Sequence, residues 1–121
     1  EDTKYARRAQ AYENLGLTEL RLDDVKDAEQ SFQRALMLNT SQPRSYLELA
    51  NIYFGAGNFN AAKEFFEKYN SISRPSARSL WLGIRLSRVL GDENQVSSYA
   101  LALKNLFPES EEYKLYQARQ W

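Results

Sequence analysis

The chain contains neither cysteine nor histidine among its 121 residues. It therefore lacks a thiolate nucleophile, a Ser-His-Asp relay, a Cys or His zinc site and a disulfide framework. Two close carboxylate pairs remain, Glu64 with Glu67 and Glu111 with Glu112. Acid–base catalysis needs groups that face each other in a cleft, whereas these pairs have the spacing of solvated charges on helix surfaces. We expect a protein that is not an enzyme and has no catalytic residue, no cofactor and no metal site.

An excess of one charge and a long apolar run are also missing. The 16 Lys and Arg residues balance the 16 Asp and Glu residues. Nucleic acid binding depends on a basic surface, so we expect no nucleic acid partner. No apolar run approaches the roughly 18 residues that a membrane-spanning helix needs. The opening stretch EDTKYARR lacks the apolar core of a signal peptide and begins without Met, which fits a mature form or an excised fragment.

Glycine and proline are scarce, and their positions mark a repeat. Windows of 34 residues that begin at Ala9, Pro43 and Ala77 place equivalent residues in register without gaps. One place in the three windows holds a small residue: Ala28, Ala62 and Val96. The place four residues later holds Phe32, Phe66 and Ala100, so the last window lacks the large apolar residue there. Pro43, Pro75 and Pro108 lie at the window ends, where proline disfavours helix continuation. The predicted repeats span about 9–42, 43–76 and 77–110.

Each window breaks near its middle, at LDDV (22–25), AGNF (56–59) and LGDE (90–93). Apolar residues three and four apart on both sides of the break indicate two amphipathic helices. In the stretch GAGNFNAAKEFF, Gly57 can end one helix in a left-handed conformation and Asn58 can cap the next. A phosphate-binding loop would need a preceding strand and a Gly-Lys-Ser/Thr ending, which are absent. We therefore predict three helical hairpins.

The two ends of the chain extend this pattern. Asp2 to Arg8 is expected to lengthen the first helix. Residues 111–121 are predicted to form one more helix that caps the apolar face of the last repeat, as solenoid proteins require. We expect Tyr113 and Tyr116 to pack in this cap, while Trp121 is left open between capping and a contact with a partner.

The 34-residue period resembles the tetratricopeptide repeat. The matching residues are Leu15-Gly16, Ala28, Phe32 and Ala35 in the first window, Tyr53, Gly57, Ala62 and Phe66 in the second, and Pro108 in the third. The third window departs from the pattern, because Leu82-Gly83 comes one place early and Val96, Ala100 and Leu103 replace Ala, Phe and Ala. The resemblance implies an all-α fold with one domain over 1–121, a right-handed α-solenoid of three hairpins plus the capping helix. The helix register around Trp81–Gly83 stays open.

A narrower resemblance covers essentially the whole chain. ENLGL (13–17), ARSLWLGIRL (77–86) and SYALALKNLFPESEEY (98–113) resemble the C-terminal half of the type IV pilus biogenesis and stability lipoproteins, the PilF/PilW family. This resemblance implies a periplasmic, outer-membrane-associated pilotin that helps the pilus secretin to reach the outer membrane and assemble. Family members carry further repeats after a lipidated N-terminal cysteine. By this resemblance the chain is a fragment without the lipid anchor, which would be its only link to the membrane.

In such a solenoid the first helix of each hairpin lines a concave groove that binds partner segments. The residues predicted to line this groove are Leu17, Leu20, Leu47, Asn51, Phe54, Trp81, Arg85 and Arg88. The alternative is internal packing of this strip under N-terminal repeats or the first helix. A clamp for a C-terminal carboxylate is not expected, because Glu13, Leu17 and Trp81 stand where donors are needed. The functional prediction is a protein-binding scaffold, with a generic envelope assembly scaffold or a structural spacer for N-terminal repeats as alternatives.

Overall fold

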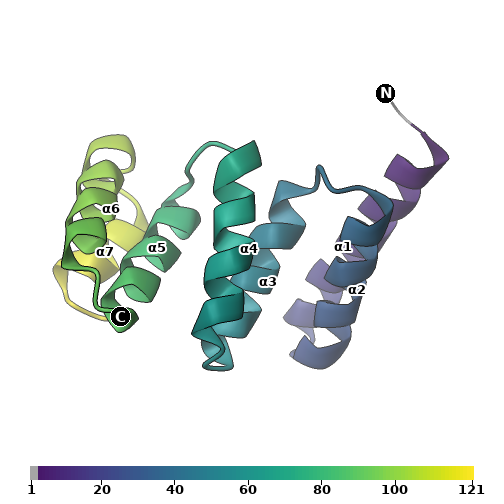
Figure 1. The fold of residues 1–121 in the computed structure, drawn as a ribbon, viewed down its shortest axis with the longest axis horizontal. Coiled ribbons are helices and arrows are strands. Elements are labelled where there is room, and N and C mark those ends of the chain that lie inside the picture. The colour runs from purple at the N-terminus through teal and green to yellow at the C-terminus, as the bar shows by residue number, and fades with distance from the viewer. Residues whose placement is uncertain (1–2) are drawn as a thin grey trace. The chain divides into compact units, whose positions relative to one another are not determined.

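The computed structural model describes residues 3–121, and all secondary structure in this range is helical (Figure 1). The described residues form seven helices. They fall into two compact units, one ending at Ser73 and the other spanning Arg74–Trp121. No helix in the described range combines the length and the apolar character needed to cross a bilayer.

The first unit consists of two helical hairpins. Its helices are α1 (Lys4–Arg21), α2 (Val25–Leu38), α3 (Pro43–Gly55) and α4 (Phe59–Ile72), and α2 also packs against α3. Thr3 caps α1 by accepting a 3.0 Å hydrogen bond from the backbone N of Ala6. The expected helical extension is confirmed for Lys4–Arg8, whereas Asp2 lies outside the described residues.

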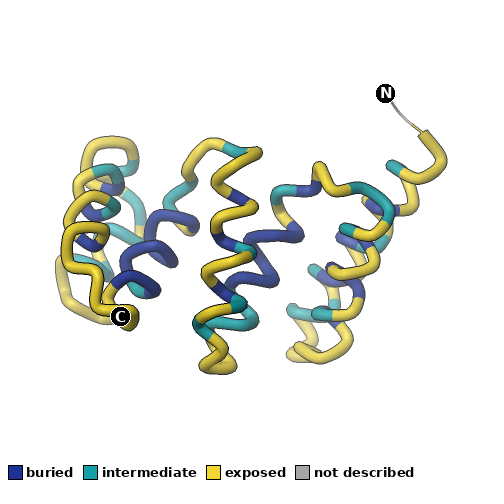
Figure 2. Tube along the Cα trace, in the orientation of Figure 1, coloured by how far each residue is buried: buried dark blue, intermediate teal, exposed yellow. Residues whose placement is uncertain are grey.

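Two small residues allow α1 and α2 to approach closely. Ala28 is fully buried, and Gly16 is buried opposite the ring of Phe32. A Cβ atom on Gly16 would lie 2.7 Å from Cε1 of Phe32, which is closer than van der Waals contact allows. Phe32 and Leu49 join Ala28 in the buried core of this unit. Figure 2 shows that buried residues lie along the helices and exposed residues at the hairpin turns. Ala28 and Gly16 therefore lie where α1 and α2 pack closely.

The hairpin turns have the predicted conformation. Gly57 and Gly91 adopt φ values of 79° and 78°, in the left-handed region that glycine enters without steric cost. Asn58 and Asp92 then cap the following helices. In the first hairpin Asp23 occupies the same left-handed region at φ 61°, which costs a non-glycine residue about 1 kcal/mol. The stretch GAGNFNAAKEFF is thus a helix–turn–helix connection.

The second unit contains α5 (Ala77–Val89), α6 (Glu93–Leu106) and α7 (Glu111–Gln117). Its buried core consists of Leu80, Trp81, Ile84, Val96, Ala100 and Leu103. The three residues of α6 that depart from the repeat pattern therefore all face the core. On α5, Leu80, Trp81 and Ile84 belong to this core, whereas Leu82 is fully buried outside it. Trp81 and Leu82 therefore lie on different buried faces of the helix.

The C-terminal cap is confirmed in part. Tyr113 and Tyr116 pack against the core of the second unit, as expected. The predicted helix over 111–121 is wrong beyond Gln117, because Arg119 adopts a left-handed φ of 57°. The backbone N of Gln120 donates to the carbonyl of Leu115 (2.9 Å), and the N of Arg119 donates to that of Tyr116 (3.0 Å). These two bonds form the Schellman motif that ends helices.

Candidate partner-binding site

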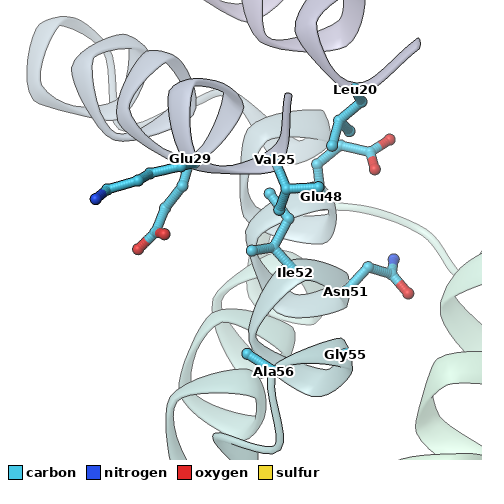
Figure 3. Close-up of a pocket in the computed structure, with 9 residues that line it drawn as sticks. Leu20, Val25, Glu29, Glu48, Asn51, Ile52, Gly55 and Ala56 are labelled. Atoms are coloured by element: carbon cyan, nitrogen blue, oxygen red, sulfur yellow. The ribbon is translucent and has the colours of Figure 1, made fainter. Parts of the chain in front are cut away.

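A surface pocket of about 640 Å³ lies in the first unit, where the end of α1 and the start of α2 meet α3 (Figure 3). In Figure 3 the side chains of Val25 and Ile52 point toward each other, with Leu20 on the α1 side. Val25 directly follows the N-cap residue Asp24 and is 42% exposed. The lining residues are Leu20, Val25, Lys26, Glu29, Glu48, Asn51, Ile52, Gly55 and Ala56. The pocket thus offers accessible apolar side chains with polar groups around them.

The two carboxylates of the pocket already have partners. Glu48 accepts a 3.0 Å bond from Nε of Arg44, and its own side chain is almost fully buried. Glu29 accepts a 2.7 Å bond from the hydroxyl of Tyr53. Burial and this hydrogen bond to Glu29 raise the pKa of Tyr53 to about 12. Neither carboxylate is placed as an exposed acid or base, so the arrangement suits non-covalent binding.

Two other polar groups of the pocket retain binding capacity. Asn51 donates its Nδ2 to the carbonyl of Leu47 (3.1 Å), while its Oδ1 accepts no hydrogen bond within residues 3–121. Lys26 is exposed and forms no ion pair in the described part of the chain. The pocket can therefore accept one hydrogen bond and neutralise one negative charge, around an apolar centre.

The predicted groove residues of the first unit are divided among three environments. Leu20 and Asn51 line the pocket. Leu17 is half-buried and packs against the core, while Leu47 is buried at 3% exposure. Phe54 is half-buried with its ring edge-on to Phe59, at a centroid distance of 5.4 Å.

Glu13, which stands where a carboxylate clamp would need a donor, has a different environment. The residue is 7% exposed. Its Oε1 accepts bonds from Oγ of Ser45 (2.8 Å) and Nε2 of Gln42 (3.2 Å), and its Oε2 accepts one from Nε2 of Gln10 (3.3 Å). Glu13 therefore links the first hairpin to the start of the second.

The three predicted groove residues of the second unit belong to an aromatic and guanidinium cluster. Trp81 is buried at 6% exposure, and the ring of Trp121 stacks on it with centroids 6.2 Å apart. Cζ of Arg85 lies 5.3 Å from the Trp81 ring, and Cζ of Arg88 lies 4.5 Å from the Trp121 ring. Burial, with the nearby charge of Arg78, lowers the pKa of Arg85 from its ordinary value.

An acidic cluster lies at the turn between α1 and α2. Glu19, Asp24 and Asp27 bring one carboxylate oxygen each within 4.8 Å of one another. A side-chain hydrogen bond with Asp24 and the charge of Asp24 raise the pKa of Asp27. Asp24 is the N-cap of α2, and Glu19 accepts a 2.6 Å bond from Ser31. These hydrogen bonds explain the positions of Asp24 and Glu19 without a metal ion.

Sequence reasoning missed most of the pocket. The missed residues are Val25, Lys26, Glu29, Glu48, Ile52, Gly55 and Ala56. Val25 gave one usable signal, since it is an apolar residue inside the polar break LDDV. The other residues have helical spacing that does not distinguish a pocket wall from an ordinary helix surface.

Comparison with known proteins identifies the family. Residues 19–79 match the family described as tetratricopeptide repeat. The type IV pilus assembly protein PilF of Pseudomonas aeruginosa is 37% identical over 118 residues, which are 98% of this chain and 47% of that protein. A solved structure of P. aeruginosa PilF superposes with a TM-score of 0.90 and covers 98% of this chain and 54% of its own.

The crystal structure of PilW, described as a widely conserved type IV pilus biogenesis factor, is also similar. It has 28% identity and a TM-score of 0.75 over 90% of this chain and 50% of its own. The chain thus spans about half the length of these relatives. The predicted all-α solenoid fold class and the resemblance to PilF and PilW are both confirmed. The chain belongs to the tetratricopeptide repeat family.

Proposed function

We propose that this chain is a scaffold in type IV pilus assembly that binds a protein partner through the pocket between α1, α2 and α3. The pocket itself is the observation that carries this proposal. It exposes apolar side chains on helices that are positioned by a buried core, and such patches with a polar rim mark partner sites. The 37% identity to PilF supports the connection to the pilus.

The partner we propose is the type IV pilus secretin, and the location is the periplasm at the outer membrane. Similarity to PilF and PilW supports this assignment. The proposed role is to assist secretin localisation and assembly, without a reaction or a cofactor. Any attachment to the membrane would be through a lipid anchor outside this chain.

The chemistry of the pocket defines the segment that would fit. Val25 and Ile52 would receive apolar side chains, as expected for the apolar face of a helix. A carboxylate on the segment would lie near Lys26, and a donor would reach Oδ1 of Asn51. The proposed ligand is therefore an amphipathic secretin segment with at least one acidic residue.

A titration of the chain with purified periplasmic domains of the secretin tests the proposal. Val25→Glu should weaken binding about tenfold. This corresponds to a loss of about 1.4 kcal/mol of binding free energy at a central contact. Asn51→Ala should weaken it less, because one hydrogen bond is lost. Leu101→Glu is the matched control, since Leu101 is 59% exposed on α6 and should tolerate the charge. Leu47 is unsuitable for this test because its substitution by Glu would bury a charge.

The alternatives predict different titrations. A generic envelope assembly scaffold would bind another envelope protein through the same pocket, with the same sensitivity to Val25→Glu, and would not bind the secretin. A structural spacer would show no binding that depends on the pocket. This chain covers about half of PilF, so the binding site of that protein can lie in its other half. The structural-spacer alternative therefore needs an explicit test. Secretin binding that is unchanged by Val25→Glu and Asn51→Ala would contradict the proposal.

A further inference from the structure

Two arginine side chains contact the ring of Trp121 in the second unit. Cζ of Arg88, on α5, lies 4.5 Å from the ring centroid, and Cζ of Arg119, after α7, lies 5.6 Å from it. The indole itself stacks on Trp81 and is tilted against Tyr116 at 5.9 Å. Trp121 is still 37% exposed, so this surface is accessible.

The backbone after α7 is arranged to hold Trp121 there. The left-handed conformation of Arg119 is sterically unfavourable for a residue with a Cβ atom. It turns the chain back toward α5, and it places the guanidinium of Arg119 4.8 Å from the Tyr116 ring. The cation–π contacts of Arg119 with Tyr116 and Trp121 favour this conformation.

The charges of this surface are not neutralised within the unit. Neither the guanidinium of Arg88 nor that of Arg119 forms a hydrogen bond or an ion pair in the described part of the chain. Helix α5 carries Arg78, Arg85 and Arg88 and no acidic side chain. A guanidinium that stacks on an aromatic ring keeps its N–H edge available, and this edge matches the two oxygens of a carboxylate.

We propose that Arg88, Trp121 and Arg119 form a docking surface for an acidic segment of a protein partner. Carboxylates of the segment accept hydrogen bonds from the two guanidinium groups, and Trp121 packs against the apolar part of a neighbouring side chain. The surface goes beyond the proposed function, because it shares no residue with the pocket of the first unit. A peptide fits better than a polyanion, since the charge is confined to a few residues and the net charge of the chain is zero.

Isothermal titration with a short synthetic peptide of alternating Glu and Gly around one Leu tests this surface. The Glu peptide should bind, and its Gln counterpart should not. Arg88→Gln and Arg119→Gly should each weaken binding about threefold, as expected for an exposed ion pair. The double variant should weaken it about tenfold. Glycine is chosen at position 119 because it keeps the left-handed turn while it removes the guanidinium.

Arg34→Gln is the matched control. Arg34 is also exposed and lies over an aromatic ring, 5.9 Å from that of Tyr12, but it belongs to the first unit. Its substitution should leave peptide binding unchanged, and circular dichroism should show that all variants are folded. The proposal is overturned if the Glu peptide does not bind, if the Gln peptide binds equally, or if the double variant binds as tightly as the parent. Tighter binding to phosphatidylglycerol vesicles or to heparin than to the peptide would also overturn the assignment to a protein partner.

Discussion

Gly16 is required by packing and not by backbone conformation. The Phe32 ring occupies the space where a side chain at position 16 would begin, and Phe32 is itself fully buried. Protein cores are close-packed, so a fully buried ring is displaced only at an energetic cost. The glycine of the Leu15-Gly16 pair thus has a physical reason in this chain.

Gly16→Ala should lower the free energy of unfolding by about 1–3 kcal/mol, the usual cost of overpacking. Gly55→Ala is the control, because a Cβ atom there meets nothing within 4 Å. That change should be neutral or stabilising, since alanine is the better helix former. Urea unfolding of both variants measures the difference. Equal stability of the two variants would contradict the packing argument.

Tyr53 should make the stability of the first unit depend on pH in the alkaline range. Its pKa is raised from 10.0 to about 12, so the folded state favours the neutral phenol that donates to Glu29. The stabilisation is fully present below pH 10.0, and it is lost as the pH rises toward about 12. Urea unfolding across this range should show a steeper decline for the parent than for Tyr53→Phe. Parallel declines would rule out this contribution.

At the scale of helices, Glu13 connects α1 to the N-terminus of α3. Its buried carboxylate satisfies the side chains of Gln42 and Ser45, which are themselves buried. Removing an acceptor from a buried network leaves its donors without a partner, and this costs more than the hydrogen bond contributes.

Glu13→Ala should therefore destabilise the first unit by about 1–3 kcal/mol. Glu13→Gln should cost less, because the amide oxygen still accepts a bond from Ser45. Thermal unfolding followed by far-ultraviolet circular dichroism would rank the two variants. If Glu13→Gln destabilised the unit as much as Glu13→Ala, the negative charge of Glu13 would stabilise the unit and its accepted hydrogen bonds would not.

The order and type of the helices could be predicted from sequence because the signals are local. Gly57-Asn58 and Gly91-Asp92 specify a left-handed turn and a cap within two residues, and the structure has both. The end of α7 could not be predicted in this way. Arg119 carries no turn signal, and its left-handed conformation accompanies ring contacts with Tyr116 and Trp121 that only the folded unit provides.

The candidate site was predictable only in part for a similar reason. A repeat register assigns a residue to a helix face, but it does not say how deeply that face is covered. Leu20 and Asn51 line the pocket, whereas Leu47 is in the interior and Trp81 lies beneath Trp121. The depth of each position depends on side chains from other helices, which the spacing along one helix cannot show.

At the scale of the whole molecule, each unit has a buried core of its own. Stacked repeats derive their stability mainly from neighbouring elements. A substitution that destabilises the core of one unit should therefore destabilise the other unit less. In the Gly16→Ala variant, hydrogen exchange should accelerate most in α1–α3 and least in α6. Mass spectrometry of exchanged peptides measures this profile. Uniform acceleration along the chain would show that both units unfold as one cooperative structure.

Both tryptophans of the chain, Trp81 and Trp121, lie in the second unit and stack on each other. Intrinsic indole emission therefore reports on the second unit alone, while the amide signal in the far ultraviolet averages over all helices. Loss of structure confined to the first unit would leave the emission spectrum unchanged. The difference between the two unfolding midpoints consequently measures the independence of the units without any added label.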